Sequence, residues 1–375
     1  MTIFSLRTSG KHIGSVALGA LSLLFALAYS LASTADECDG FGADDYLCGI
    51  PSAEDLVQVP ESHWIIASGF ALPPALSLID SRNKAWEPLY SKMQSRADHD
   101  EERFAECPGA PELTTLVTHG LDIISEGNGH STLYAVGHGG REAIEVFDVY
   151  MAGPDSTPAL TWIGCVLTPE GLEANSVAAL RDGSLLATVP LEEGQTFAAA
   201  MQGTVTGAAY HWSAQEGSWN RLDITEQPYA NGIAVSADES EVYIASSGLA
   251  NVTAYKFGET MDAMWSTATL PVIPDNLHRD SAGRLITAGM VLEYPACNPY
   301  NEQGQVELAL FASCPRPYKV LSLDPDSQVV SVVASNTASP VFSNVTMAVV
   351  VDGTLWVGTF GGDRVAYRNV GEAMK

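Results

Sequence analysis

The sequence predicts an all-β protein, a six-bladed β-propeller preceded by an N-terminal signal or anchor segment. A strand–turn–strand unit recurs six times in the 375 residues, helical periodicity is nearly absent after the first segment, and that segment resembles an export leader. The units start roughly 43–70 residues apart. A propeller needs such a repeat, whereas a β-sandwich does not need the same unit six times. We therefore expect one domain over residues 36–375.

Residues 1–35 have the composition of a signal peptide or membrane anchor. Arg7 and Lys11 precede the apolar run of residues 13–32, and the small residues Ser33–Ala35 offer a cleavage site. The run is long for a signal peptide, so it could instead remain as an anchor that associates with a membrane. Both interpretations export the domain, which would be secreted, periplasmic or tethered to a membrane outside the cytoplasm.

The formal charge of −27 comes from 45 acidic and 18 basic side chains. Such a surface repels phosphate backbones, so nucleic acid is not expected as a partner. Six cysteines behind an export leader favour disulfides, and no CxxC pair typical of zinc occurs. Cys297 and Cys314 flank a polar loop and are expected to pair, with Cys38 and Cys48 as a second local pair. The sequence indicates no oligomeric state.

Each unit has two short strands joined by a turn, and a third strand follows at a variable distance. The turns Asp182-Gly183 and Asp352-Gly353 have the residues that hairpins need. A short helix is expected only around Ser91–Phe104. The first and second strands are predicted at Leu56–Val59 and Trp64–Gly69, Leu121–Ile124 and Leu133–Gly137, Val177–Leu180 and Leu185–Val189, Ile233–Val235 and Val242–Ser246, Leu277–Arg279 and Leu285–Gly289, and Met347–Val350 and Leu355–Thr359. The third strands are predicted at Leu76–Asp80, Ile144–Tyr150, Ala209–Ser213, Thr253–Phe257, Val320–Leu323 and Val365–Arg368.

A polar residue stands just before the first strand of every unit. In a propeller this strand lies innermost, so the position faces the central channel. The distance from this position to the second strand is nearly constant, at ten or eleven residues in four of the units. The six positions hold, in order, Glu54-Asp55, His119, Asn175, Asn231, Asp275-Asn276 and Asn344.

These channel positions are rich in oxygen ligands and contain no thiol. Calcium takes six to eight such oxygens in proteins. Asn and Asp also form local turns at strand starts, but their recurrence at the equivalent position of four units favours a metal site. The sequence predicts one calcium ion held, together with water, by Glu54, Asn175, Asn231, Asp275 and Asn276.

The same segments, in the same order, resemble the paraoxonase-type lactonases and arylesterases, within the superfamily of gluconolactonase-like and strictosidine-synthase-like propellers. The resemblance covers nearly the whole chain after the leader. The Asn-Gly-Ile-x-x-Ser piece is shared across the superfamily, and the histidines narrow the resemblance to the paraoxonases. The matching segments are Cys48-Gly-Ile-Pro-Ser-Ala-Glu-Asp, His119-Gly-Leu with His138 nineteen residues later, Asn175-Ser-Val-Ala, Ala230-Asn-Gly-Ile-Ala-Val-Ser and Asp275-Asn-Leu.

The resemblance assigns the five oxygen ligands to a catalytic calcium and makes His119 and His138 the catalytic pair. It also implies a second, structural calcium that would be bound by Asp55 and by the carbonyl of Leu121. Ser176 stands where the family has an aspartate on this second ion. The sequence therefore predicts the first ion more strongly than the second.

The implied activity is the calcium-dependent hydrolysis of lactones and aryl esters. Calcium would polarise the carbonyl, His119 would deprotonate a water molecule, and His138 would pass the proton outward. No GxSxG elbow occurs, which disfavours a serine hydrolase. The remaining histidines considered, interpreted as structural and away from the channel, are His63, His130, His211 and His278.

Two alternatives stay open. The protein could be a sugar lactonase of the gluconolactonase type, in which the metal and its oxygen ligands suffice without a histidine base. It could also be a non-enzymatic propeller, stabilised by calcium, whose blades bind a partner, because propellers host many functions. Replacement of His119 distinguishes the two enzymatic readings.

Overall fold

The computed structural model describes residues 38–71 and 74–371, so the predicted leader lies outside the described residues. The chain divides into residues 1–39 and a compact unit of residues 40–375, and the latter is the propeller. Within the described ranges, no helix has both the length and the apolar character that a membrane crossing needs.

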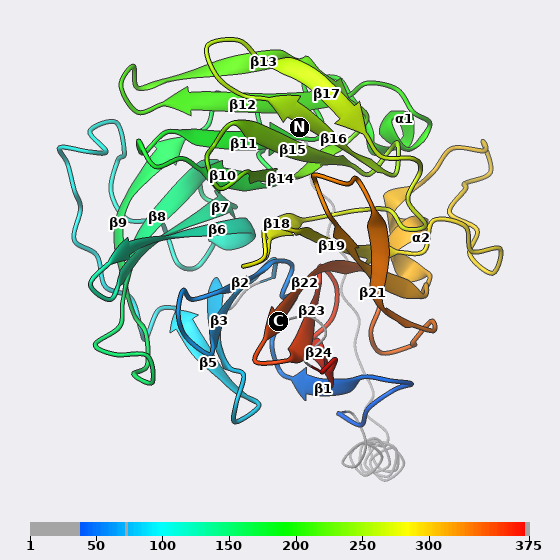
Figure 1. Cartoon of the computed structure of the whole chain (residues 1–375), viewed down its shortest axis with the longest axis horizontal. Coiled ribbons are helices and arrows are strands. Elements are labelled where there is room, and N and C mark those ends of the chain that lie inside the picture. Colours follow the sequence, from blue (N-terminus) through cyan, green and yellow to red (C-terminus); the bar gives the residue numbers. More distant parts are fainter. Residues whose placement is uncertain (1–37, 72–73, 372–375) are drawn as a thin grey trace, which may run out of the picture. The chain divides into compact units, whose positions relative to one another are not determined.

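Six four-stranded antiparallel sheets form the blades of the propeller around a central channel (Figure 1). In blades 1–5 the strands follow chain order from the innermost strand outward, and the innermost strands of neighbouring blades contact one another. Blade 1 contains β2 (Leu56–Gln58), β3 (Trp64–Ser68), β4 (Leu76–Asp80) and β5 (Ala85–Tyr90); blade 2 contains β6 (Val117–Gly127), β7 (His130–His138), β8 (Ala143–Tyr150) and β9 (Ala159–Leu167). Blade 3 contains β10 (Val177–Ala179), β11 (Leu185–Val189), β12 (Gly207–Ser213) and β13 (Ser218–Gln227); blade 4 contains β14 (Ala230–Val235), β15 (Glu241–Ser246), β16 (Asn251–Lys256) and β17 (Asp262–Ser266). Blade 5 contains β18 (Leu277–Arg279), β19 (Leu285–Met290), β20 (Tyr318–Leu323) and β21 (Val330–Asn336).

The ring closes in blade 6, where strands from both ends of the propeller unit pair. This blade contains β22 (Val345–Val351), β23 (Thr354–Thr359) and β24 (Arg364–Asn369), and its outermost strand is β1 (Asp45–Cys48). The pairing is antiparallel, with Asp45 opposite Tyr367 and Cys48 opposite Arg364. A strand from the start of the propeller unit thus completes the last blade, and these hydrogen bonds close the circle of blades around the channel.

The six-bladed fold that the sequence predicts is confirmed, and all eighteen predicted strands exist within a few residues of their expected bounds. The sequence analysis did not locate the outermost strands, such as β17 and β21. These strands are mostly exposed, so they lack the run of buried apolar residues that identifies the inner strands.

The helix predicted around Ser91–Phe104 is wrong. This segment instead runs along the outer strand β9, where Trp162 donates its N–H to the carbonyl of Arg96 and accepts from Asp98, both at 2.9 Å. Phe104 is buried against the position of Gly164. Because β9 satisfies these backbone groups, the segment gains nothing from helical hydrogen bonds. Two short helices form elsewhere, α1 (Phe197–Met201) and α2 (Leu308–Ser313).

Disulfides link loops of the propeller to nearby segments. The predicted bond between Cys297 and Cys314 is confirmed, and it encloses the loop that carries α2. A second bond, which the sequence analysis did not predict, joins Cys107 to Cys165 on β9. Cys38 and Cys48 are also disulfide-bonded, so all six cysteines are oxidised.

Candidate functional site

The five predicted calcium ligands come together at the end of the channel where the innermost strands begin. We call Glu54, Asn175, Asn231, Asp275 and Asn276 the oxygen ring. The Asn276 amide donates to Glu54 Oε1 at 2.7 Å, although the two residues are 222 positions apart in the chain. Asn231 forms a side-chain hydrogen bond with Asp275. The ring therefore contains side chains from blades 1, 3, 4 and 5.

Glycines next to the channel residues let neighbouring blades approach this closely. Gly232 donates its N–H to the carbonyl of Asp275 at 3.0 Å, and Gly120 donates to the carbonyl of Asn175 at the same distance. A Cβ atom on Gly232 would lie 2.5 Å from that Asp275 oxygen, so no larger residue fits without moving a blade. The His-Gly and Asn-Gly pairs of the sequence thus hold adjacent inner strands together beside the site.

The oxygen ring contains four buried oxygen atoms without hydrogen-bond partners. They are Glu54 Oε2 and the Oδ1 atoms of Asn175, Asn231 and Asn276, and each parent residue is at most 3% exposed. The Asn231 and Asn276 amide nitrogens instead donate to protein atoms, to Ser247 Oγ at 3.0 Å and to Glu54. An unpaired buried polar group costs about 1–3 kcal/mol, so such a cluster is unfavourable without a ligand.

This set of oxygens fits a calcium ion. Calcium prefers carboxylate and amide oxygens, and the four unpaired ones come from four different blades. In the part of the chain that the structure describes, no three His, Cys, Asp or Glu side chains form a metal cluster. The candidate site therefore depends on asparagine oxygens, with Glu54 and Asp275 as its carboxylates.

Burial disfavours the ionised form of both carboxyl groups of the oxygen ring. Burial, together with the charges of Asp275 and Asp55, raises the pKa of Glu54 well above its usual value. Burial also raises the pKa of Asp275 to about 7, with a further contribution from Asp55. A bound cation would reverse both effects, because it stabilises the ionised form of each carboxylate.

The two predicted catalytic histidines lie together beside the ring. His119 Nε2 is 3.6 Å from Glu54 Oε1 and 3.5 Å from the Asn175 amide nitrogen. Its other nitrogen, Nδ1, is 3.3 Å from His138 Nε2, and His138 Nδ1 is 2.5 Å from Glu142 Oε2. Burial, and secondarily the neighbouring His138, lowers the pKa of His119 to about 3. His119 is therefore neutral at pH 7.

Two residues that the sequence analysis missed complete this part of the site. Glu142, in the turn after β7, ends the chain of side chains at the surface, where it is one-third exposed. The Phe70 ring lies against His119, with centroids 4.4 Å apart, and meets His138 edge-on at 6.4 Å. Phe70 and His138 both follow a glycine at the end of a second strand, which is the signal that could have identified Phe70.

The residues predicted for a second calcium lie one step along the inner strands. We call Asp55, Leu121, Asp122, Ser176 and His278 the His278 layer. Asp55 Oδ1 accepts hydrogen bonds from Leu56 N and His278 Nε2, and Oδ2 accepts from Leu121 N, all at 2.8 Å. Ser176 is buried, and its hydroxyl has no partner.

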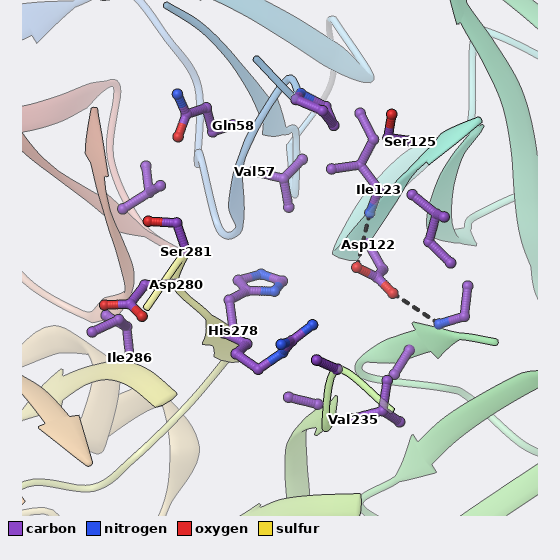
Figure 2. Close-up of a pocket in the computed structure, with 18 of the residues that line it drawn as sticks. Val57, Gln58, Asp122, Ile123, Ser125, Val235, His278, Asp280, Ser281 and Ile286 are labelled. Atoms are coloured by element: carbon purple, nitrogen blue, oxygen red, sulfur yellow. Dashed lines mark hydrogen bonds between the residues drawn. The ribbon is translucent and has the colours of Figure 1, made fainter. Parts of the chain in front are cut away.

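The interpretation of His278 as lying away from the channel is wrong. It is the middle residue of β18, and it lines a cavity of about 770 Å³ in the channel, together with Asp122 (Figure 2). Burial disfavours the charged imidazole, but the carboxylates of Asp55 and Asp122 together outweigh this effect and raise the pKa of His278 overall. Strand alternation could have revealed its position, because Asn276 and His278 are two residues apart and share a face.

The 770 Å³ cavity is separate from the oxygen ring. It is lined by the middle and far ends of the inner strands, and none of the five ring residues belongs to it. The cavity and the oxygen ring therefore lie at different positions along the channel. The unpaired oxygens and the histidine pair identify the ring as the better candidate for chemistry.

No protein-family model matches the chain, and no curated protein sequence matches it. Among solved structures, a luciferin-regenerating enzyme is similar, with a TM-score of 0.51 and 14% identity over 87% of this chain and 94% of that chain. A gluconolactonase from Xanthomonas campestris (TM-score 0.49, 14% identity, 90% and 93% coverage) and regucalcin, a calcium-binding protein from Agrobacterium tumefaciens (0.49, 11%, 87% and 93%), are also found. The first similarity confirms the propeller fold, and at this identity it concerns the fold alone.

Proposed function

We propose that the protein is a calcium-dependent hydrolase that opens lactones, with aryl esters as additional substrates. The observation that carries this proposal is the oxygen ring, in which four buried oxygens without partners lie beside a neutral histidine. A ring of this kind suits a hard cation, and a histidine next to it suits the activation of water.

The oxygen ring would hold the ion through its two carboxylates and three amide oxygens. When bound, calcium polarises an ester carbonyl and stabilises the negative charge that develops on its oxygen. The fixed orientation of the amides supports this role. Because Asn231 and Asn276 commit their nitrogens to protein partners, their oxygens are directed to the site before any ligand arrives.

His119 is placed to act as the general base. Its Nε2 is the nitrogen nearer the ring, so it would accept the proton of the water whose oxygen attacks the carbonyl carbon. The Nδ1 proton can then pass to His138 Nε2, 3.3 Å away. The bond between the carbonyl carbon and the ester oxygen of the lactone then breaks. The leaving ester oxygen takes a proton back from the histidine pair, and a hydroxy acid results.

Glu142 is a positioning residue for this pair. Its carboxylate accepts a hydrogen bond from His138 Nδ1, which leaves Nε2 of His138 free to face His119. Partial exposure of Glu142 also connects the pair to bulk water. The Phe70 ring packs against His119 and meets His138 edge-on, so it supports the position of the His119 imidazole.

A panel of lactones and aryl esters, assayed with and without a chelator, tests the proposal. We expect turnover of at least one lactone class, loss of turnover on chelation, and recovery when calcium is added back. Calcium binding without turnover of any substrate would favour the non-enzymatic propeller. Absence of calcium from the purified protein, with a melting curve that chelation leaves unchanged, would contradict the metal site itself.

We also propose that the domain works outside the cytoplasm. The oxidised state of all six cysteines supports this, because such bonds persist in oxidising compartments. Fractionation of cells that express the full chain would test it, and a soluble cytoplasmic protein with reduced thiols would contradict it.

A further inference from the structure

Protein donors occupy most of the acceptor capacity of the Asp55 carboxylate, with two hydrogen bonds to Oδ1 and one to Oδ2. Asp55 is 0% exposed and follows Glu54 directly in the chain. The three groups that donate to it are the backbone N–H of Leu56 in blade 1, the backbone N–H of Leu121 in blade 2 and the imidazole of His278 in blade 5. Hydrogen atoms therefore occupy three of the roughly four lone-pair directions that a cation could use.

The other members of the His278 layer do not supply a replacement ligand set. Asp122 Oδ1 accepts from Ile123 N at 2.9 Å, and its Oδ2 accepts from Ala179 N at 2.8 Å (Figure 2). Ser176 adds only an uncharged hydroxyl. The layer thus lacks the unpaired carboxylate and amide oxygens of the ring above it, and these residues do not fit a second calcium ion.

We propose that the His278 imidazole takes the place of a second calcium ion in this chain. It links blade 5 to Asp55 in blade 1, and through Asp55 to Leu121 in blade 2, so it joins three blades across the channel as a bound cation would. The protein then holds one calcium ion and not two. The number of bound calcium ions, one, rests on the proposed function, whereas the role of His278 does not.

Calcium stoichiometry provides the first test. The purified full-length protein, stripped with a chelator and titrated with calcium by calorimetry, should bind one ion per chain. Two ions per chain would overturn the inference. A protein that binds none would contradict the proposed function, and the inference would then depend on the variants below.

The double variant Ser176→Asp with His278→Ala should gain a calcium ion. It removes the His278 donor from Asp55 Oδ1, which then keeps only the bond from Leu56 N, and it adds a further carboxylate beside Gly120, whose position Ser176 touches. We expect one additional ion per chain, with a dissociation constant of about 10⁻⁶–10⁻³ M. Ser176→Asp alone should gain none, because His278 still faces Asp55. A gain in this single variant would overturn the inference.

Thermal melting keeps the inference testable if the double variant folds poorly. His278→Ala should lower the melting temperature by at least about 5 °C, because Asp55 loses a buried partner. His130→Ala is the matched control, since His130 pairs with Asp148 at the same distance of 2.8 Å but is 47% exposed. Equal melting temperatures for the two variants, with no calcium gained by the double variant, would overturn the proposal.

Discussion

Two adjacent acidic residues, Glu54 and Asp55, stand in opposite environments. Both are buried, but Glu54 keeps an oxygen without a partner, while Asp55 is surrounded by three donors. The first belongs to the oxygen ring and the second to the His278 layer. Burial and charge alone do not distinguish them. The number of hydrogen bonds that each accepts does distinguish them. A carboxylate oxygen without any partner can bind a cation, whereas a carboxylate whose two oxygens both accept from protein donors links parts of the protein.

The largest expected effect comes from the matched substitutions Glu54→Gln and Asp55→Asn, which separate the two layers. Glu54→Gln should weaken calcium binding by about 100-fold or more and remove most hydrolysis, because it takes charge away from the ion. It should leave the melting temperature of the calcium-free protein unchanged or higher, since a buried charge is lost. Asp55→Asn should lower that melting temperature, because three donors lose their carboxylate.

Calcium titration and melting of both variants, with and without a chelator, check this crossed pattern. Glu101→Gln, at an exposed position, is the control and should match the wild type in both measurements. If Glu54→Gln and Asp55→Asn lower calcium affinity equally, the distinction between the two layers is wrong.

A second prediction concerns the chemistry next to the ring. His119→Gln keeps a polar side chain beside Glu54 but removes the base, so kcat should fall by about 100-fold while calcium affinity stays nearly the same. Lactones should lose at least as much rate as aryl esters, whose better leaving groups need less help. Steady-state kinetics and calorimetry provide the measurements. Near-normal lactone turnover with calcium bound would replace the histidine mechanism by the gluconolactonase-type reading.

A smaller effect is expected from Glu142→Gln. The glutamine amide is an uncharged partner for His138 Nδ1, so it holds the imidazole of His138 less firmly in its orientation toward His119. We therefore expect kcat to fall by about tenfold, with KM unchanged. Glu142→Asp should recover part of the rate. Asp148→Asn alters a similar carboxylate–histidine pair away from the channel and should leave kcat unchanged. An equal loss in Glu142→Gln and Asp148→Asn would remove Glu142 from the mechanism.

The smallest effect is expected from Ser176→Ala in the His278 layer. Its buried hydroxyl has no partner, so removal should leave the stability unchanged or raise it by about 1 kcal/mol, and calcium stoichiometry should stay the same. Denaturant unfolding and calcium titration check this. A loss of bound calcium in Ser176→Ala would show that the His278 layer binds an ion after all.

The sequence by itself determined the six-bladed fold and the ring positions. Both follow from local patterns, because a strand, its turn and its partner strand lie within a few tens of residues, and the channel position precedes each inner strand at a nearly fixed spacing. The outermost strands escaped prediction because their exposed residues have no strong apolar alternation, and the segment near Phe104 was misread because its partner β9 lies some sixty residues away.

Only the tertiary structure decided which polar groups meet across the channel. Glu54 and Asn276 are 222 residues apart, Asp55 and His278 are 223 apart, and both contacts exist because blade 6 closes the ring with β1. Closure of the propeller determines which amide nitrogens donate to protein atoms and which oxygens have no hydrogen-bond partner. It also brings His278 into contact with Asp55. Which polar groups are paired depends on distances between blades. Residue spacing within the sequence of one blade does not determine those distances.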